Sequence, residues 1–221
     1  METLPRRKPE QIGRNPEVTR NRILDAALQE FAAHGFAGAR VDVIARAAHI
    51  NKRMLYHYFG DKEALFREIL RRKITARAAW LSSAPENLWQ SVPAWFELMG
   101  QDPEWIRLLQ WEALQWGEKA TVIDEDRRRK GFKGAIARIR EQQSRGEIPA
   151  QLDAGQLLLS VLALTAYPFA FPQLTRLATG LPVSAPAFRK QREAFLREFT
   201  AFFATRTETL TDGKPAEAST N

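Results

Sequence analysis

The sequence predicts an all-α protein built from two parts. Apolar residues recur at helical spacing along most of the 221 residues, and no segment keeps the two-residue alternation of a strand for long. The formal net charge of +7 is unevenly placed: residues 1–80 contain sixteen Lys and Arg against nine Asp and Glu, whereas residues 81–221 contain seventeen of each. This asymmetry indicates a basic N-terminal unit followed by a neutral one.

The composition supports a folded core and removes several kinds of site. Hydrophobic residues make up 44% of the chain and charged residues 27%, which is typical of a folded protein. The chain has no cysteine, which excludes disulfides, thiolate metal ligands and a cysteine nucleophile. Its three histidines are scattered, and neither a glycine-rich phosphate loop nor a Ser/His/Asp spacing occurs. We therefore expect no catalytic residue, metal or cofactor, and no enzymatic activity.

Four helices are predicted in the basic unit, with recognisable start and stop signals. The first, at about 16–35, ends at Gly35, because glycine favours the backbone that terminates a helix. Short helices follow at about 41–48 and 52–59. Asp61 is the predicted N-cap of the fourth, which continues to about residue 80.

The helix at 52–59 has two chemically different sides. At 100° per residue, one side carries two cations, a phenol and an imidazole, from Lys52, Arg53, Tyr56 and His57. The other side is apolar and carries Met54, Leu55, Tyr58 and Phe59. Such a helix packs on its own domain by one side and offers Lys and Arg to phosphates and guanine edges by the other.

The connection into this helix has the length of a helix–turn–helix. Three residues, from His49 to Asn51, separate it from the preceding helix, and Asn51 is a predicted N-cap. The charge excess favours duplex DNA as the partner, because basic surface neutralises phosphates. The pattern alone leaves open the alternative of a small helical domain that has a charged outer face and no DNA-binding function.

A longer run of residues carries a resemblance to a known family. It comprises Arg22-Ile23-Leu24-Asp25-Ala26-Ala27, Phe31, Gly35-Phe36, Val41, Ile44-Ala45, Ala47-Ala48, and Leu55-Tyr56-His57-Tyr58-Phe59-Gly60-Asp61-Lys62-Glu63-Ala64-Leu65. With these, residues about 18–70 resemble the N-terminal domain of the TetR family of transcriptional regulators. The last block is the specific part, and the resemblance covers about a quarter of the chain.

The resemblance implies a three-helix DNA-binding domain, followed by a larger helical domain for ligand binding and dimerisation. The helix at 52–59 would be the recognition helix of a helix–turn–helix at about Val41 to Gly60. The implied DNA contacts are Arg40, Asn51, Lys52, Arg53, Tyr56, His57 and Lys62. Two departures from the family pattern stand out: His49 replaces the usual glycine of the turn, and Ala39-Arg40 replaces the usual Ser or Thr cap. Histidine accepts a left-handed backbone less easily than glycine, so we expect either a slightly strained turn or a His49 side chain that reaches towards the DNA backbone.

The neutral part is predicted to be helical throughout. Helices are expected at about 86–99, 103–116, 122–145, 153–167 and 187–206, with a loop at 171–186, which gives about nine helices in all. The predicted boundaries are a flexible basic arm at 1–15, the helix–turn–helix domain at 16–62, the larger domain at 63–208 and a disordered tail at 209–221.

Six tryptophans fall between residues 80 and 116. Aromatic residues at helical spacing are most often core, but an aromatic-lined pocket for a small apolar or aromatic effector is the functional interpretation. Its candidate residues are Trp95, Met99, Trp111 and Gln115. The strongly apolar helices at 153–167 and 187–206 are the candidates for a homodimer interface, because such faces must be covered.

The sequence therefore predicts a ligand-responsive repressor that binds a palindromic double-stranded DNA operator as a homodimer, in the cytoplasm and without a membrane partner. The alternative is a helical adaptor whose basic half binds protein or an anionic surface without reading DNA sequence. Sequence-selective DNA binding with a steep salt dependence separates the two.

Overall fold

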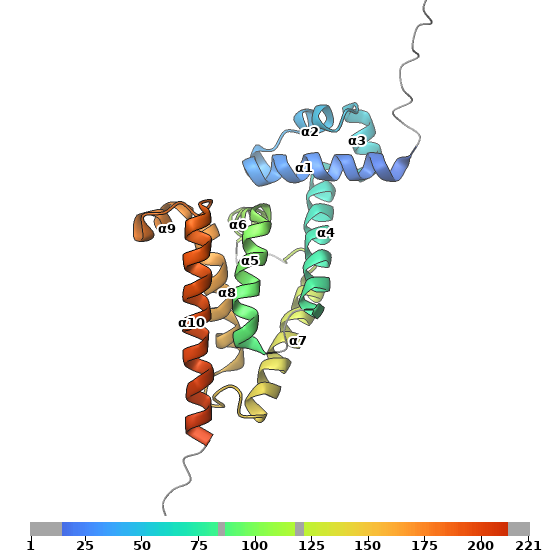
Figure 1. Cartoon of the computed structure of the whole chain (residues 1–221). Helices are drawn as coiled ribbons and strands as arrows, with labels where there is room; N and C mark the ends of the chain where they lie inside the picture. The colour runs from blue at the N-terminus through green and yellow to red at the C-terminus, as the bar shows by residue number, and fades with distance from the viewer. Residues whose placement is uncertain (1–14, 84–86, 118–121, 212–221) are drawn as a thin grey trace, which may run out of the picture. The chain divides into compact units, whose positions relative to one another are not determined.

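Ten helices and no strand occupy residues 15–83, 87–117 and 122–211, which are the residues that the computed structural model describes. The all-α prediction is confirmed, with one helix more than expected. The chain divides into two compact units, Met1–Ile69 and Leu70–Asn221, and each is considered by itself (Figure 1). The predicted arm at 1–15 and tail at 209–221 lie outside the described residues, apart from Asn15 and the end of the last helix.

The first unit contains α1 (Pro16–Gly38), α2 (Val41–Ala47), α3 (Lys52–Phe59) and the first part of α4 (Lys62–Ser83). The predicted bounds of α3 are confirmed, and those of α2 differ by one residue. The backbone of α1 breaks at Gly35, where φ is 70°. Glycine adopts this conformation at little cost, so the predicted stop acts where expected, although one short turn follows it.

Aromatic packing forms the core of the first unit. Phe31 of α1 and Phe66 of α4 are fully buried, with ring centroids 4.9 Å apart and ring planes at 71°. Phe36 adds a second edge contact to Phe66 at 5.6 Å. Leu55 of α3 is also fully buried and anchors that helix. Burial of each such side chain contributes about 1.5–3 kcal/mol, which holds the short helices in place.

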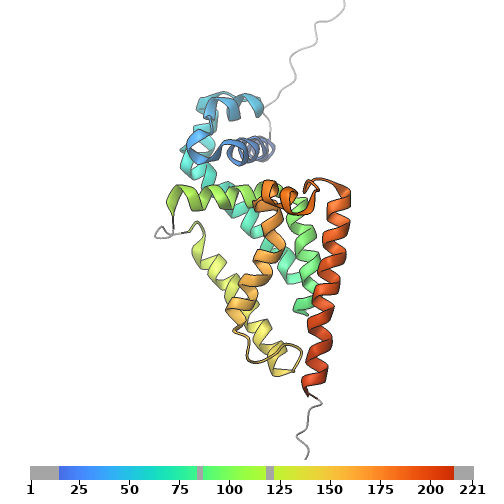
Figure 2. The same ribbon diagram turned by 90° about the vertical axis from the view of Figure 1, so that its left-hand side faces the viewer.

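The second unit contains the rest of α4 and six further helices: α5 (Leu88–Gln101), α6 (Pro103–Trp116), α7 (Glu125–Ser144), α8 (Ala154–Ala170), α9 (Pro172–Thr179) and α10 (Pro186–Thr211). Helix α5 is central and packs against α8 and α10 (Figure 2). Its buried residues Trp89, Val92 and Phe96 form one apolar core with residues of α7, α8 and α10. The predicted bounds of α6 are confirmed.

Helix α9 contradicts the expectation of a loop at 171–186. Pro172 occupies the first helical turn, and Gly180 ends the helix with a left-handed φ of 74°. Proline at the start and glycine just beyond the end are themselves helix boundary signals, which a proline-rich composition obscured. Helix α8 likewise continues through Pro168, past the predicted end at residue 167.

No single helix among the described residues is both long and apolar enough to cross a membrane. Helices α8 and α9 pass that test only when they are joined, and the chain bends by 90° between them. Leu158, Val161 and Thr165 of α8 are buried within the second unit.

Candidate nucleic-acid interface

The turn after α2 has a defined hydrogen-bond pattern and a left-handed residue. Ile50 N donates to Ala45 O, and His49 N donates to Arg46 O, both at 3.0 Å. This pairing requires a left-handed residue at the position after the helix cap, and His49 provides it with a φ of 53°. The strained turn, one of the two expectations for His49, is therefore present, and the contact with the DNA backbone stays a prediction. A side chain in this region costs about 1–2 kcal/mol.

A side chain of α1 donates a hydrogen bond to the same turn. Arg22 Nη2 donates to Ala48 O at 2.7 Å, and the two residues are 26 positions apart. Arg22 belongs to the residues that resemble the TetR family, but this hydrogen bond could not be predicted from the sequence. Contacts between residues so far apart along the chain leave no pattern in the residues around either one. The bond ties α1 to the connection that orients α3.

Helix α3 presents its polar side to solvent. Asn51 Oδ1 accepts a hydrogen bond from Met54 N at 2.8 Å, which confirms the predicted N-cap. Four side chains of the predicted DNA-facing side are exposed, those of Lys52, Arg53, Tyr56 and His57. Lys52 Nζ lies 5.8 Å from the centre of the Tyr56 ring, and no described carboxylate pairs with Lys52 or Arg53. The two cations are thus available to an external anion.

The apolar side of α3 is narrower than predicted. Met54 is 40% exposed, so its placement on the packed side was wrong. Tyr58 and Phe59 are half-buried, and the Arg20 guanidinium lies 5.4 Å from the centre of the Phe59 ring. In an eight-residue helix, one fully buried residue, Leu55, does most of the anchoring.

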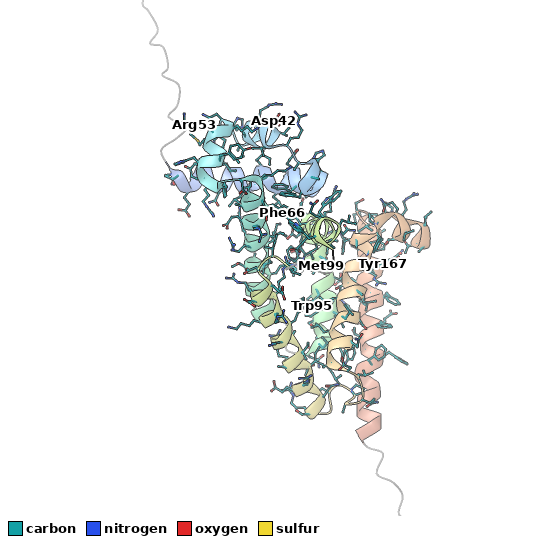
Figure 3. All side chains as sticks on the ribbon, turned by 180° about the vertical axis from the view of Figure 1, so that it is seen from behind. Asp42, Arg53, Phe66, Trp95, Met99 and Tyr167 are labelled. Atoms are coloured by element: carbon teal, nitrogen blue, oxygen red, sulfur yellow. The ribbon has the colours of Figure 1, made fainter. Side chains whose placement is uncertain are left out.

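Arg40 precedes α2 and makes no side-chain cap there, as the missing Ser or Thr predicts. Its guanidinium lies 3.3 Å from Asp42, and Arg46 lies 3.9 Å from the same carboxylate. Desolvation raises the pKa of Asp42, whereas the charges of Arg40 and Arg46 and local hydrogen bonds lower it, and the net pKa lies below its ordinary value. Figure 3 labels Asp42 on α2 and Arg53 on α3. Asp42 therefore partly neutralises two exposed arginines.

Lys62, the remaining predicted DNA contact, is already engaged within the first unit. Its ammonium donates to Ala37 O at 3.3 Å and lies 5.1 Å from the centre of the Phe36 ring. The side chain is half-buried. Lys62 thus ties the end of α1 to the start of α4, and it offers less of its charge to a phosphate than Lys52 does.

The four pocket candidates of the second unit lie on two helices. Trp95 and Met99 are buried one turn apart on α5 (Figure 3). Trp111 is half-buried on α6, and Gln115 of the same helix is exposed. The structure therefore brings the α5 pair together in the interior and places Gln115 at the surface.

Glu112 of α6 is buried and already paired. Its two carboxylate oxygens accept from Arg128 Nη1 at 2.7 Å and from Arg128 Nη2 at 3.1 Å. The pairing partner lies 16 residues away, so only the fold reveals it.

Exposed apolar side chains gather on the last three helices. The large ones are Leu159, Tyr167, Phe171, Leu174, Leu177, Phe195, Phe199 and Phe202. Leu158 and Val161 of α8 and Phe188 of α10 are instead part of the monomer core. Helices α8 and α10 thus have one side that is covered within the chain and another side that is not.

Comparisons with known proteins agree with this organisation. Residues 23–69 match the family model described as bacterial regulatory proteins, tetR family, and residues 88–201 match the tetracyclin repressor-like C-terminal domain. The HTH-type transcriptional repressor SCO4008 of Streptomyces coelicolor is 35% identical over 167 residues, which cover 76% of this chain and 86% of that protein.

Solved structures with the same fold include two regulators. The putative transcriptional regulator SCO4942 from Streptomyces coelicolor superposes with a TM-score of 0.68 at 28% identity, covering 82% of this chain and 97% of the other. FadR from Bacillus subtilis, solved in complex with stearoyl-CoA, shares the fold at 17% identity with a TM-score of 0.58, over 80% of this chain and 96% of the other. From its two domain matches and its repressor relative, the chain belongs to the TetR family and is a DNA-binding transcriptional regulator.

Proposed function

We propose that this regulator is a ligand-responsive repressor that binds a palindromic operator as a homodimer, with α3 in the major groove. The observation that carries the proposal is the division of α3 between a buried anchor, Leu55, and an exposed side on which Lys52 and Arg53 have no carboxylate partner among the described residues. Lys and Arg bind phosphates and guanine edges, and Tyr56 and His57 add hydrogen-bonding rings beside them. Arg40, Asn51 and Lys62 complete the proposed contact set.

The exposed apolar sides of α8 and α10 support the homodimer. Leu159, Phe195, Phe199 and Phe202 are all exposed on these two helices, and clustered exposed apolar side chains mark interaction surfaces. Two chains are also needed to place two recognition helices in successive major grooves, about 34 Å apart. As a test, Leu159→Asp puts a charge on the uncovered side of α8. We expect light scattering to report a monomer for this variant and a dimer for the wild type.

A matched control for that test is Leu114→Asp, which changes an exposed leucine of α6 that is 76% exposed. This variant stays dimeric if α8 and α10 form the interface. A monomeric Leu114→Asp protein, or a dimeric Leu159→Asp protein, would contradict the proposed interface.

DNA reading is tested on the region upstream of the chain's own gene. Footprinting of the purified chain is expected to protect a palindromic site, with affinity that falls steeply as salt rises. Lys52→Ala and Tyr56→Ala weaken operator binding while the dimer stays folded, and Lys190→Ala, an exposed lysine of α10, serves as the control. Binding that is indifferent to DNA sequence would favour the adaptor instead.

The proposal assigns the chain no catalysis and a cytoplasmic location, where its DNA partner lies. In the described ranges, no group of three His, Asp or Glu is arranged to hold a metal ion. A small effector in the second unit would release the operator by binding one conformation of the dimer better than the other. The FadR structure with stearoyl-CoA shows that this fold accommodates a ligand. An effector that binds without changing operator affinity contradicts this mechanism.

A further inference from the structure

Two largely buried clusters of charged side chains lie between α4, α6 and α7 in the second unit. In the first, Asp102 joins α5 to α6 and accepts from Lys73 Nζ at 2.6 Å, while Arg77 Nη2 lies 3.4 Å from its other oxygen. The Arg77 side chain is only 12% exposed. The short contact to Lys73 and the long one to Arg77 show that this carboxylate serves the lysine better than the arginine.

The second group is the Glu112–Arg128 pair. Glu112 accepts two bonds from Arg128 and a third from Ile123 N at 3.1 Å, so its hydrogen-bonding capacity is well used. One indole ring connects the two groups: the guanidinium carbons of Arg77 and Arg128 lie 4.8 Å and 6.0 Å from the centre of Trp105. Two largely buried guanidinium groups therefore adjoin one aromatic side chain.

Positive charge and hydrogen-bond donors are in excess at this place. Lys73, Arg77 and Arg128 face two carboxylates, and Asp124, one turn before Arg128, adds a third carboxylate that lies 3.4 Å from Arg127. Among the described residues, Asp124 Oδ2 accepts no hydrogen bond, so the cluster contains one unsatisfied buried acceptor as well. The buried Nε atoms of Arg77 and Arg128 have no hydrogen-bond partner among the residues that the structure describes. A buried donor left unpaired costs about 1–3 kcal/mol, so an acceptor supplied from outside would be bound with that gain.

Arg77 is the least satisfied of these cations. Its Nη1 faces the thioether of Met99 at 3.8 Å, a weak acceptor, and burial lowers the pKa of Arg77 to about 10 although Asp102 acts to raise it. One turn along α5, the buried Trp95 Nε1 also lacks a partner. Met99 is unbranched and has three rotatable bonds, so it is the side chain that gives way most readily beside Arg77.

We propose that the effector of the second unit is an aromatic organic anion, whose carboxylate pairs with Arg77 and Arg128 and whose ring lies against Trp105 and Met99. The inference rests on the proposed function and narrows the class of its effector. A cationic effector is disfavoured because Asp102 and Glu112, the carboxylates beside Trp105, already have cationic partners. Planar, bidentate pairing with carboxylates is what guanidinium groups do best.

The test compares three benzene derivatives of the same size and different charge on the full-length chain without DNA. Benzoate is the anion, benzamide the neutral analogue and benzamidine the cation. At about 10 mM, ten times a millimolar Kd, benzoate is expected to raise the melting temperature and to change tryptophan emission saturably. Benzamide and benzamidine are expected to do neither. Equal effects of benzamide or benzamidine, or none from benzoate, overturn the proposal.

A substitution locates the site. Arg77→Gln keeps hydrogen-bond donors, removes the charge and leaves the Lys73–Asp102 pair in place, so the fold is retained. We expect benzoate to bind this variant at least tenfold more weakly. The control is Arg67→Gln, an exposed arginine of α4 paired with Glu63 in the first unit, which leaves benzoate binding unchanged. Unaltered benzoate binding by Arg77→Gln refutes the site. A chain that binds benzoate but no operator refutes the proposed function instead.

Discussion

The two units of this protein use their cations in opposite ways. On α3, Lys52 and Arg53 are exposed and have no described carboxylate partner. In the second unit, Arg77 and Arg128 are largely buried beside carboxylates and an indole ring. An exposed cation keeps its hydration until a phosphate replaces it, whereas a buried one has already lost its water. The first arrangement suits a polyanion that binds and leaves, and the second suits a small anion that reaches the interior.

The difference also shows why net charge is a poor guide to an individual site. The first 80 residues carry the whole excess of +7, and the remainder is formally neutral. Two of the three cations around Trp105, Lys73 and Arg77, belong to those first 80 residues, yet in the fold they lie in the second unit with Arg128, Asp102 and Glu112. Charge counted along the sequence thus combines the DNA-binding unit with part of the interior cluster, and only the fold separates the two.

Removing the Glu112 carboxylate would produce the largest effect on the buried side of this comparison. Glu112→Ala leaves the Arg128 guanidinium buried without its carboxylate, and we expect the free energy of unfolding to fall by about 3 kcal/mol. Urea denaturation measures the change. The exposed pair of Glu141 with Arg145 gives a matched control, and Glu141→Ala should alter stability by less than about 0.5 kcal/mol. Equal losses for the two variants would remove the distinction between buried and exposed pairs.

Substitutions of Arg53 test the role of the exposed cations of α3. Arg53→Ala is expected to reduce operator affinity by about 1–3 kcal/mol while the unfolding transition stays where it is. Fluorescence anisotropy on the footprinted operator measures the affinity, and thermal melting checks the fold. Arg53→Lys separates base reading from phosphate contact, because lysine keeps the charge but loses bidentate geometry. A destabilised Arg53→Ala protein would assign this residue to the core.

His49 offers a smaller, stabilising change. Glycine relieves the left-handed strain of about 1–2 kcal/mol but loses about 0.5–1 kcal/mol through its freer unfolded chain, so His49→Gly should gain up to about 1 kcal/mol. Urea denaturation measures the gain. Gly146 closes α7 with the same hydrogen-bond pattern, so Gly146→His should lose a similar amount. A destabilised His49→Gly variant would mean that the imidazole makes a contact worth more than the strain.

Asp42 should give the smallest effect. Asp42→Asn frees Arg40 and Arg46 from a carboxylate, and operator affinity should rise about twofold to fivefold, as expected for an exposed charge. The increase is measured by anisotropy at low salt and should shrink as salt is added. Glu17→Gln, at the exposed start of α1, provides the control for a general gain of positive charge. Equal increases in the two variants would make the Asp42 effect nonspecific.

Local signals in the sequence were sufficient for much of the fold. The bounds of α3 and α6 and the start of α4 follow from caps and periodicity alone, because Asn51, Pro103 and Asp61 act on residues within one turn of themselves. Helix α9 was not predicted, because its prolines and glycine were interpreted as the composition of a loop rather than as helix boundaries. The exposure of Met54 was not predicted, because helical periodicity shows which side of a short helix is apolar but not how much of that side is buried.

The residues of the candidate sites also divide into those that depend on sequence neighbours and those that depend on contacts between distant residues. The exposed residues of α3 could be predicted, since exposure on a docked helix follows from the sequence around it. The bond from Arg22 to Ala48 and the pair of Glu112 with Arg128 could not, because each joins residues at least 16 positions apart. Unpaired buried donors such as Arg77 Nε are defined only by what surrounds them in three dimensions.

The uncovered apolar sides of α8 and α10 have a consequence for gene control. If two chains must join through these surfaces before an operator is bound, the amount of dimer at low concentration follows the square of the monomer concentration. Doubling the number of chains in a cell then raises the number of competent repressors about fourfold. The response of a target promoter to repressor dose becomes steeper than linear, and the strength of this apolar contact sets the range of copy number over which the steep response occurs.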